Sequence, residues 1–117
     1  PYVLGRLFSV LESIQEAATP GLNATIKNKY YDSASATPSV IFPIVINLSD
    51  KHLSKLTRDS KGLAVYYEKI KGDLLDKLDE FPRRLSLEEQ GAFILGYYHQ
   101  NQKRYEKKEA ETENKEV

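Results

Sequence analysis

Apolar side chains recur along this chain at intervals of three and four residues, the spacing that places them on one face of an α-helix. In residues 2–18, leucine, isoleucine and valine form one row, while Arg6, Glu12 and Glu16 lie opposite. The same spacing predicts five helices, over about residues 2–18, 24–34, 37–57, 63–80 and 86–108. Neither paired strands nor a strand–helix alternation is predicted. We therefore expect an all-α fold, a single-domain bundle of about five helices.

The helix boundaries coincide with residues that stop or start helices. Proline and glycine in residues 19–21 end the first helix, because proline lacks an amide hydrogen and glycine adopts a left-handed turn. Thr37 and Pro38 start the third helix, since proline at the first helical position loses no hydrogen bond. We expect a polar turn at residues 58–62, and the fourth helix ends at residues 81–82.

The fifth helix has the clearest local signals. Ser86 and Glu89 are spaced as a capping box, in which each side chain accepts a hydrogen bond from the other residue's backbone amide. Glu88 and Glu89 also place negative charge at the positive end of the helix dipole, which accounts for this acidic pair better than paired catalytic acids do. Behind the cap, one face of the helix carries Leu87, Gly91, Ile94, Leu95, Tyr98, Gln102 and Tyr105.

Length and charge limit the fold and its partners. A chain of 117 residues is expected to form one domain with a sizeable core. Lys plus Arg (17) equals Asp plus Glu (17), and the last eight residues hold three glutamates against one lysine. Residues 1–109 therefore carry 16 basic and 14 acidic side chains, a bias too weak to be a nucleic-acid signature by itself. We divide the chain into a helical bundle domain, residues 1–109, and a disordered acidic tail, residues 110–117.

The sequence lacks the residues and motifs that several classes of functional site require. Without cysteine there is no disulfide or thiolate metal site, and His52 and His99 lack a metal-ligand spacing. The sequence contains no nucleotide-binding or nucleophile motif, no secretory signal and no apolar run near the ~20 residues that span a bilayer. We therefore expect no enzyme, no metal, no cofactor and no membrane partner. The chain has no methionine and starts at Pro1, as expected for a mature chain without its initiator or for a segment of a longer protein.

Tyrosine is the unusual residue of this chain. Six of the eight tyrosines form doublets, at residues 30–31, 66–67 and 97–98. Neighbouring helix positions point about a quarter-turn or more apart, so one tyrosine of each pair is expected in the core and the other at a boundary. A boundary tyrosine either stacks on an unpaired base or fills a helix–helix seam with its hydroxyl in water. We favour the seam and keep base stacking as the alternative.

Basic side chains supply the candidate nucleic-acid contacts. Lys51, Lys55 and Arg58 are spaced i, i+4, i+7, so they form one face of the third helix that can follow a phosphate backbone. Further candidates are Lys27 and Lys29 on the second helix and Arg83 and Arg84 before the fifth. The alternative is that these charges serve solubility alone.

Three segments together resemble one known family: residues 2–12 (YVLGRLFSVLE), residues 23–56 and residues 85–102 (LSLEEQGAFILGYYHQNQ). In this order they are similar to the C-terminal region of the large subunit of the type I-C CRISPR surveillance complex, Cascade. In that system the region is also made separately, by internal translation, as the small subunit of the complex. The length of the chain and its missing methionine resemble that separate subunit. The similarity covers most of residues 1–105.

The resemblance implies an all-α, non-catalytic subunit of the bacterial cytoplasm. Its implied partners are the backbone and large subunits of Cascade, the R-loop of crRNA and target DNA, and further copies of itself. Because base pairing reads the sequence, such a protein needs to supply only contacts to the nucleic-acid backbone. The alternative is a scaffold subunit that bridges neighbouring subunits and touches no nucleic acid.

Overall fold

A computed structural model describes residues 1–22 and 25–116, with side chains up to residue 104 and at Glu106. The described residues form helices and no strand, which confirms the predicted all-α bundle. The helices are α1 (Tyr2–Ala18), α2 (Ile26–Ala36), α3 (Pro38–Asp59), α4 (Lys61–Asp76) and α5 (Leu87–Glu116). α1 has its predicted bounds, whereas the predicted start of the second helix, at residue 24, lies outside the described residues.

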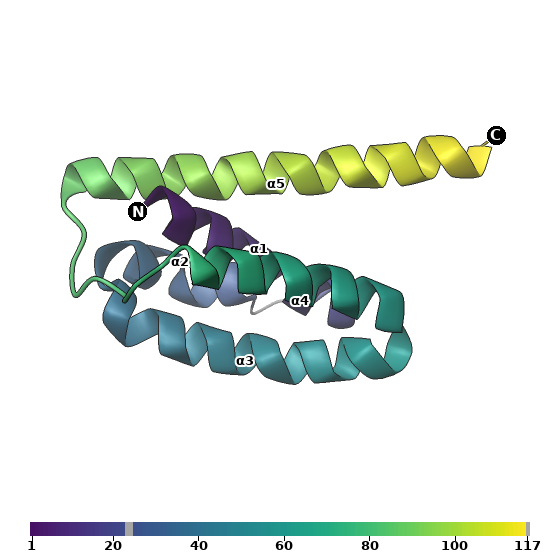
Figure 1. Cartoon of the computed structure of the whole chain (residues 1–117), viewed down its shortest axis with the longest axis horizontal. Helices are drawn as coiled ribbons and strands as arrows, with labels where there is room; N and C mark the ends of the chain where they lie inside the picture. The colour runs from purple at the N-terminus through teal and green to yellow at the C-terminus, as the bar shows by residue number, and fades with distance from the viewer. Residues whose placement is uncertain (23–24, 117) are drawn as a thin grey trace.

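α1 is the central helix of the bundle. It contacts each of the other four helices, and in Figure 1 it lies between α5 on one side of the molecule and α3 on the other. Its buried residues therefore surround the helix axis instead of forming one row: Leu4, Gly5, Leu7, Phe8, Ser9, Val10, Leu11, Ser13, Ile14, Gln15 and Ala18. A helix buried on all sides must be mostly apolar, and the three polar residues among these all form hydrogen bonds.

Five aromatic rings fill the centre of the core, where α1, α2, α3 and α5 meet. Phe8 has no exposed surface, and its ring centroid lies 5.6–6.3 Å from those of Tyr31, Phe42, Phe93 and Tyr97. The angles between the ring planes are 55–81°, the tilted and edge-to-face arrangements that aromatic pairs prefer. Phe8 therefore connects the central helix to three of its neighbours.

α1 and α5 cross with their backbones in direct contact, at one glycine from each helix. A Cβ atom on Gly5 would lie 2.8 Å from the amide nitrogen of Tyr97. A Cβ atom on Gly96 would lie 3.2 Å from the amide nitrogen of Arg6. In each case a carbonyl oxygen of the facing helix would be closer still. Only residues without a side chain allow this approach.

Side-chain hydrogen bonds continue the contact between α1 and α5 around this crossing. The pairs are Tyr2 with His99 (2.8 Å), Arg6 with Gln100 (3.1 Å), Ser9 with Asn101 (2.6 Å) and Ser13 with Arg104 (3.0 Å). These polar partners lie on the side of α5 that faces the bundle. The contact therefore fixes both the position of α5 along α1 and the rotation of α5 about its own axis.

The apolar face that the sequence indicates on α5 points away from the bundle. Phe93, Tyr97 and Gln100 are buried instead. The exposed fractions are 86% for Leu87, 41% for Ile94, 56% for Leu95 and 58% for Tyr98, and Gly91 and Gln102 are also exposed. We call Leu87, Gly91, Ile94, Leu95 and Tyr98 the outer α5 face. Tyr105, the last residue of the predicted face, lies outside the described side chains.

The connection between α3 and α4 is shorter than predicted, and the prediction of a polar turn over residues 58–62 is wrong. Ser60 alone separates the two helices. Its amide donates to the carbonyl of Leu56 at 2.7 Å, and its carbonyl accepts from the amide of Ala64 at 3.0 Å. The backbone of Ser60 is bonded to both helices, so a single residue is enough to connect them. Gly62 lies inside α4.

α4 ends at Asp76 and not at residue 80, as the periodicity predicted. The amide of Lys77 bonds to the carbonyl of Leu74 at 3.2 Å, which tightens the last turn. Residues 79–80 are acidic and would be unfavourable at the negative end of the helix dipole. The chain leaves the helix here and places Phe81 on Phe42, with the two rings stacked and their centroids 5.2 Å apart.

The predicted capping box at the start of α5 is confirmed. The Ser86 amide donates to Glu89 Oε1 at 2.9 Å, and the Glu89 amide donates to Ser86 Oγ at 3.1 Å. The bond from the Ser86 amide, with a smaller contribution from the Ser86 side chain, lowers the pKa of the Glu89 carboxyl, because it favours the charged form. At the other end, the α5 backbone extends to Glu116. The domain division at residue 109 and the disorder of residues 110–117 stay predictions, since the side chains there lie outside the described part.

Candidate nucleic-acid interface

Lys51, Lys55 and Arg58 lie on the second half of α3, on the side away from the bundle core. The opposite side of this half is buried through Ser49, Leu53 and Leu56. Lys51 and Arg58 are exposed and Lys55 is half-buried. At a rise of about 1.5 Å per residue, their positions span roughly 10 Å along the helix. We call these three residues the basic α3 row.

One of the two acidic residues next to the basic α3 row is paired with another helix, whereas Asp59, beside Arg58, is exposed. Asp50, the acidic neighbour of Lys51 in sequence, accepts a hydrogen bond from Lys71 of α4 at 2.6 Å. Arg58 lies in the last turn of α3, where the negative end of the helix dipole stabilises a basic side chain. Lys51 and Arg58 therefore present positive charge at the surface, with Lys55 half-buried between them, and contact of the row with nucleic acid stays a prediction.

A polar network that the sequence pattern did not reveal lies beside this row. Gln15 Oε1 accepts from the backbone amide of Ile26 at 2.7 Å, and Gln15 Nε2 lies 3.4 Å from His52 Nε2. The other imidazole nitrogen lies 3.4 Å from the Thr19 hydroxyl, which also accepts from Lys55 Nζ at 3.4 Å. The end of α1 and the second half of α3 therefore meet at His52, and Gln15 extends the network to the start of α2. No local motif marks such a network, because its members come from three helices.

His52 is expected to make the stability of the fold depend on pH. Its pKa lies below the ordinary value of 6.5, first because it is partly buried and then because Lys55 repels the imidazolium. The unfolded chain therefore takes up the proton more readily. The contribution of His52 to stability is complete above pH 6.5 and declines as the pH falls through 6.5 towards the folded-state pKa. Urea unfolding of the wild type and His52→Gln from about pH 5 to pH 8 measures this decline. An equal decline in both proteins would contradict the assignment.

The two lysines of α2 lie over aromatic rings. Lys27 Nζ lies 5.2 Å from the ring centroid of Tyr97 and 5.9 Å from that of Tyr31. Lys29 Nζ lies 5.8 Å from the ring centroid of Tyr30. Lys27 is half-buried and belongs to the seam between α2 and α5, whereas Lys29 is exposed. Of the two candidates, Lys29 is therefore the more accessible to a phosphate.

Arg83 and Arg84 are exposed beside the opposite end of α3. The amide of Ser39 donates to the carbonyl of Pro82 at 2.9 Å, which fixes the chain just before the arginines. Both arginines line a surface hollow with residues 37, 39 and 40. Ser39 and Lys51 are twelve residues apart, or about 18 Å along α3. The structure therefore places the arginines and the basic α3 row at two separate positions along one helix.

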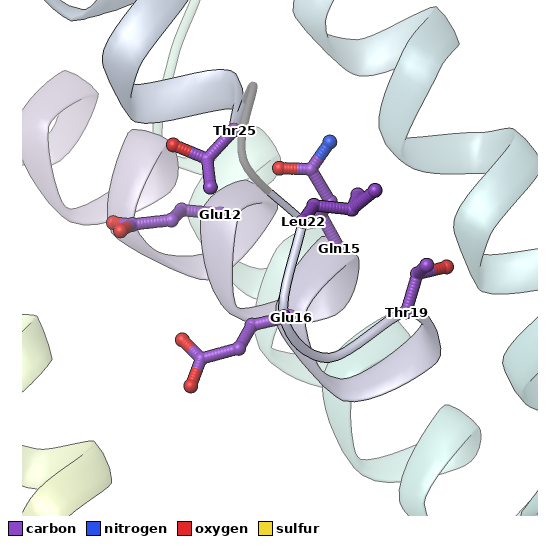
Figure 2. Close-up of a pocket in the computed structure, with 7 residues that line it drawn as sticks. Glu12, Gln15, Glu16, Thr19, Leu22 and Thr25 are labelled. Atoms are coloured by element: carbon purple, nitrogen blue, oxygen red, sulfur yellow. The ribbon is translucent and has the colours of Figure 1, made fainter.

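A pocket between α1 and the chain that follows it has an acidic lining. Its lining residues are Glu12, Gln15, Glu16, Thr19, Gly21, Leu22 and Thr25. Figure 2 shows the carboxylates of Glu12 and Glu16 pointing to the same side of α1. Glu12 accepts a hydrogen bond from the Tyr97 hydroxyl, and Glu16 pairs with Arg104. Carboxylates repel phosphate, so this pocket is not part of the candidate interface.

Of the three tyrosine doublets, the one at residues 97–98 divides between core and surface as predicted. The other two do not, because Tyr30, Tyr31 and Tyr67 are half-buried and Tyr66 is exposed. Tyr97 is 1% exposed and Tyr98 is 58% exposed. Burial, with the hydrogen bond to Glu12, raises the pKa of the Tyr97 hydroxyl. Tyr31 is half-buried and packs edge-to-face on Tyr97, with 5.0 Å between the ring centroids. These contacts favour the seam interpretation for Tyr31 and Tyr97, while base stacking stays an alternative for Tyr98.

Within residues 1–22 and the described part after residue 24, no three histidine, aspartate or glutamate side chains converge as metal ligands would. In that same part, no helix combines the length and the apolar character needed to cross a bilayer. Both histidines join helices, His52 as described above and His99 through the Tyr2 hydroxyl.

A known family model matches most of the chain. This family, described as CRISPR-associated protein (Cas_Csd1), matches residues 1–105. The matched range includes the basic α3 row, the lysines of α2 and the arginines before α5. No curated protein matches the chain.

Proposed function

The chain belongs to the Cas_Csd1 family of CRISPR-associated proteins, and on this premise we propose that it is the small subunit of a type I-C RNA-guided surveillance complex. In this proposal the subunit is non-catalytic and works in the bacterial cytoplasm. It bridges the backbone subunits of Cascade and stabilises the DNA of the R-loop through its basic helix surfaces. Its partners are the backbone and large subunits, the R-loop and further copies of itself.

The basic α3 row is the observation that carries the proposed DNA contact. Three cationic side chains lie in line on one side of α3, two of them exposed and Lys55 half-buried, and the neighbouring carboxylate of Asp50 is paired with Lys71. Positive groups spaced about one helical turn apart match the repeated charge of a phosphate backbone. Such contacts recognise no sequence, which suits a complex in which the guide RNA reads the target.

The near-neutral charge of the chain suits a subunit that binds DNA only within an assembly. With 17 basic and 17 acidic residues, an isolated copy is expected to bind DNA weakly. Once the copy is held beside the R-loop by its neighbours, the effective concentration of DNA around it is high. A few phosphate contacts for each copy are then enough to stabilise the opened strand.

Reversing the charge of the basic α3 row tests the proposal. We expect the triple variant Lys51→Glu, Lys55→Glu and Arg58→Glu to assemble normally and to weaken target-DNA binding by the whole complex about tenfold or more at low salt. The slope of log affinity against log salt should become shallower by roughly two units, because each lost phosphate contact removes about 0.7–0.9. Binding of labelled target DNA across a salt series gives both quantities.

The matched control reverses the same number of charges on another surface. Lys61, Lys69 and Lys77 lie exposed along and just after α4, so their triple glutamate variant has the same net charge as the test variant. We expect this control to bind DNA as the wild type does, apart from a small general charge effect. Equal losses in the two variants would show that net charge alone acts, and no loss in either would overturn the DNA contact.

A protein–protein scaffold without nucleic-acid contact is the second candidate function. The observation that favours it is the outer α5 face, a large apolar surface of a kind that often marks a protein interface. The same experiment separates the two functions. A scaffold predicts that the charge-reversed complex assembles and binds DNA with unchanged affinity and salt slope.

A further inference from the structure

The segment that connects α4 to α5 holds two adjacent arginines, residues 83–84, between two backbone hydrogen bonds (Figure 1). Before the arginines, the carbonyl of Pro82 accepts from the amide of Ser39 at 2.9 Å. After them, the amide of Leu85 donates to the carbonyl of Ala36 at 3.1 Å, and the Leu85 side chain is buried. The backbone of the arginines is therefore fixed before any partner binds, which lowers the entropy cost of binding.

The charges of Arg83 and Arg84 are not neutralised by the chain itself. Both side chains are exposed. In the part of the chain that the structure describes, neither forms an ion pair or a side-chain hydrogen bond, although Glu80 and Glu88 are near them in sequence. A guanidinium group presents a planar fork of donors that fits a carboxylate or a phosphate. An anionic group from outside the chain is therefore the expected partner of the two arginines.

The surface hollow beside these arginines is partly apolar. It has a volume of about 490 Å³ and is lined by Thr37, Ser39, Val40, Arg83 and Arg84. Val40 is 61% exposed, and the apolar surface continues along α3 to Ile44, which is 43% exposed one turn later. A volume in this range suits a ligand of a few side chains. Such a ligand contacts both cationic groups and an aliphatic surface.

The first turn of α3 lacks the free amides that bind a phosphate at a helix N-terminus. Pro38 has no amide hydrogen, and the Ser39 amide is used in the bond described above. The amides of Val40 and Ile41 both donate to the carbonyl of Thr37, at 3.2 and 3.3 Å. Phosphate sites at helix N-termini use such amides. The hollow therefore favours a carboxylate beside an apolar side chain over a phosphate.

We propose that this hollow docks an acidic segment of a neighbouring protein subunit, in which carboxylates lie beside an apolar side chain. Arg83 and Arg84 bind the carboxylates, and the apolar side chain packs on Val40. The Ser39 hydroxyl lines the same hollow and can donate a further hydrogen bond. This inference rests on the bridging part of the proposed function, because it names where a neighbouring subunit binds and by what chemistry. It does not depend on the basic α3 row.

The affinity of the chain for the rest of the purified complex tests the docking site. Arg83→Glu/Arg84→Glu should lower this affinity about tenfold or more, because like charges then meet in the hollow. Lys61→Glu/Lys69→Glu is the matched control, since it makes the same change of net charge at two exposed positions on α4. The control should join the complex as the wild type does. Circular dichroism verifies that both variants are folded.

Val40→Ser distinguishes an acidic protein segment from nucleic acid as the occupant. The change removes apolar surface and leaves every charge in place, so it should weaken incorporation about fivefold. A phosphate bound by the arginines alone would not respond to it. If the arginine double variant joins the complex normally and only its DNA binding weakens, the hollow binds nucleic acid and the proposal is wrong. Normal assembly with normal DNA binding would also overturn it.

Photo-crosslinking from position 40 identifies the occupant. Benzoylphenylalanine in place of Val40 should cross-link to one segment of a neighbouring subunit in the assembled complex, with aspartate or glutamate next to an apolar residue. Changing those carboxylates to lysine should restore the incorporation of Arg83→Glu/Arg84→Glu. Cross-links to DNA or RNA, or to a segment without carboxylates, would overturn the docking site alone. A wild-type chain that does not join the complex would overturn the proposed function, and this docking site with it.

Discussion

Alanine at position 96 is expected to destabilise this protein by about 3 kcal/mol or more, the upper end of the cost of overpacking. The added Cβ would lie 3.2 Å from the amide nitrogen of Arg6 and closer still to a carbonyl oxygen of α1. Backbone atoms of a helix cannot turn aside as a flexible side chain can, so α1 and α5 must separate. Urea unfolding of Gly96→Ala against the wild type measures the loss. Gly5→Ala, the reciprocal change on α1, should cost a similar amount.

Gly91→Ala on the same helix is the matched control for this prediction. Position 91 is exposed, and its Cβ would meet nothing within 4 Å. The substitution therefore leaves only the helix preference of alanine over glycine, which should stabilise the protein by up to about 1 kcal/mol. Opposite signs for Gly96→Ala and Gly91→Ala would establish the close crossing. Stabilisation by both would mean that the helices do not touch at Gly96.

Phe8→Ala is expected to cost about 3–5 kcal/mol, the range for removing a fully buried aromatic side chain. Phe8 touches rings from three other helices, so its loss leaves a cavity that no single helix can close. Total stabilities of about 5–15 kcal/mol are usual for domains, so this loss removes a large part of the stability. Phe8→Leu, which fills most of the space, should lose about 1.5 kcal/mol or less. Chemical denaturation measures both variants.

Phe81→Ala serves as the comparison for Phe8. Phe81 is half-buried and stacks on Phe42 from outside the cluster. Folding removes less apolar area of Phe81 from water. Phe81→Ala should therefore lower the free energy of unfolding by about half as much as Phe8→Ala, or less. Equal losses at the two positions would contradict the central position of Phe8 in the core.

The helices were predictable from the sequence because local signals define them. Residues 19–21, the Pro38 start and the Ser86–Glu89 capping box each act within one turn of helix, and each falls at an observed boundary. The prediction failed where a tertiary contact determined the boundary. α4 ends four residues early in the structure, where the following chain leaves to stack Phe81 on Phe42.

The rotation of α5 was not predictable, because this helix has two apolar sides. Periodicity identifies Ile94, Leu95 and Tyr98 as one face but does not show what covers it. The bundle packs instead against the side with Phe93 and Tyr97, where Gly96 allows the backbones to meet. A close crossing needs a glycine from each helix, and no pattern within one helix reveals that its partner has one.

The candidate site was also predictable only where its residues lie within one helix. The basic α3 row follows from a spacing of four and then three residues within one helix, and the structure places it on the surface. The network of His52, Gln15 and Thr19 joins three helices and was missed. Lys27 was predicted as a candidate nucleic-acid contact, yet it lies over Tyr97, which is seventy residues away in sequence.

The position of α1 at the centre of the bundle has a consequence for synthesis. α1 leaves the ribosome before the four helices that cover it, and its partners on α5 are about ninety residues further along. Until α5 is made, the side of α1 that carries Gly5 has no covering helix. Contacts so distant in sequence also slow folding, because the loop they close must be ordered first. The nascent chain therefore completes this core only once α5 has been made, and until then it exposes an apolar helix to chaperones.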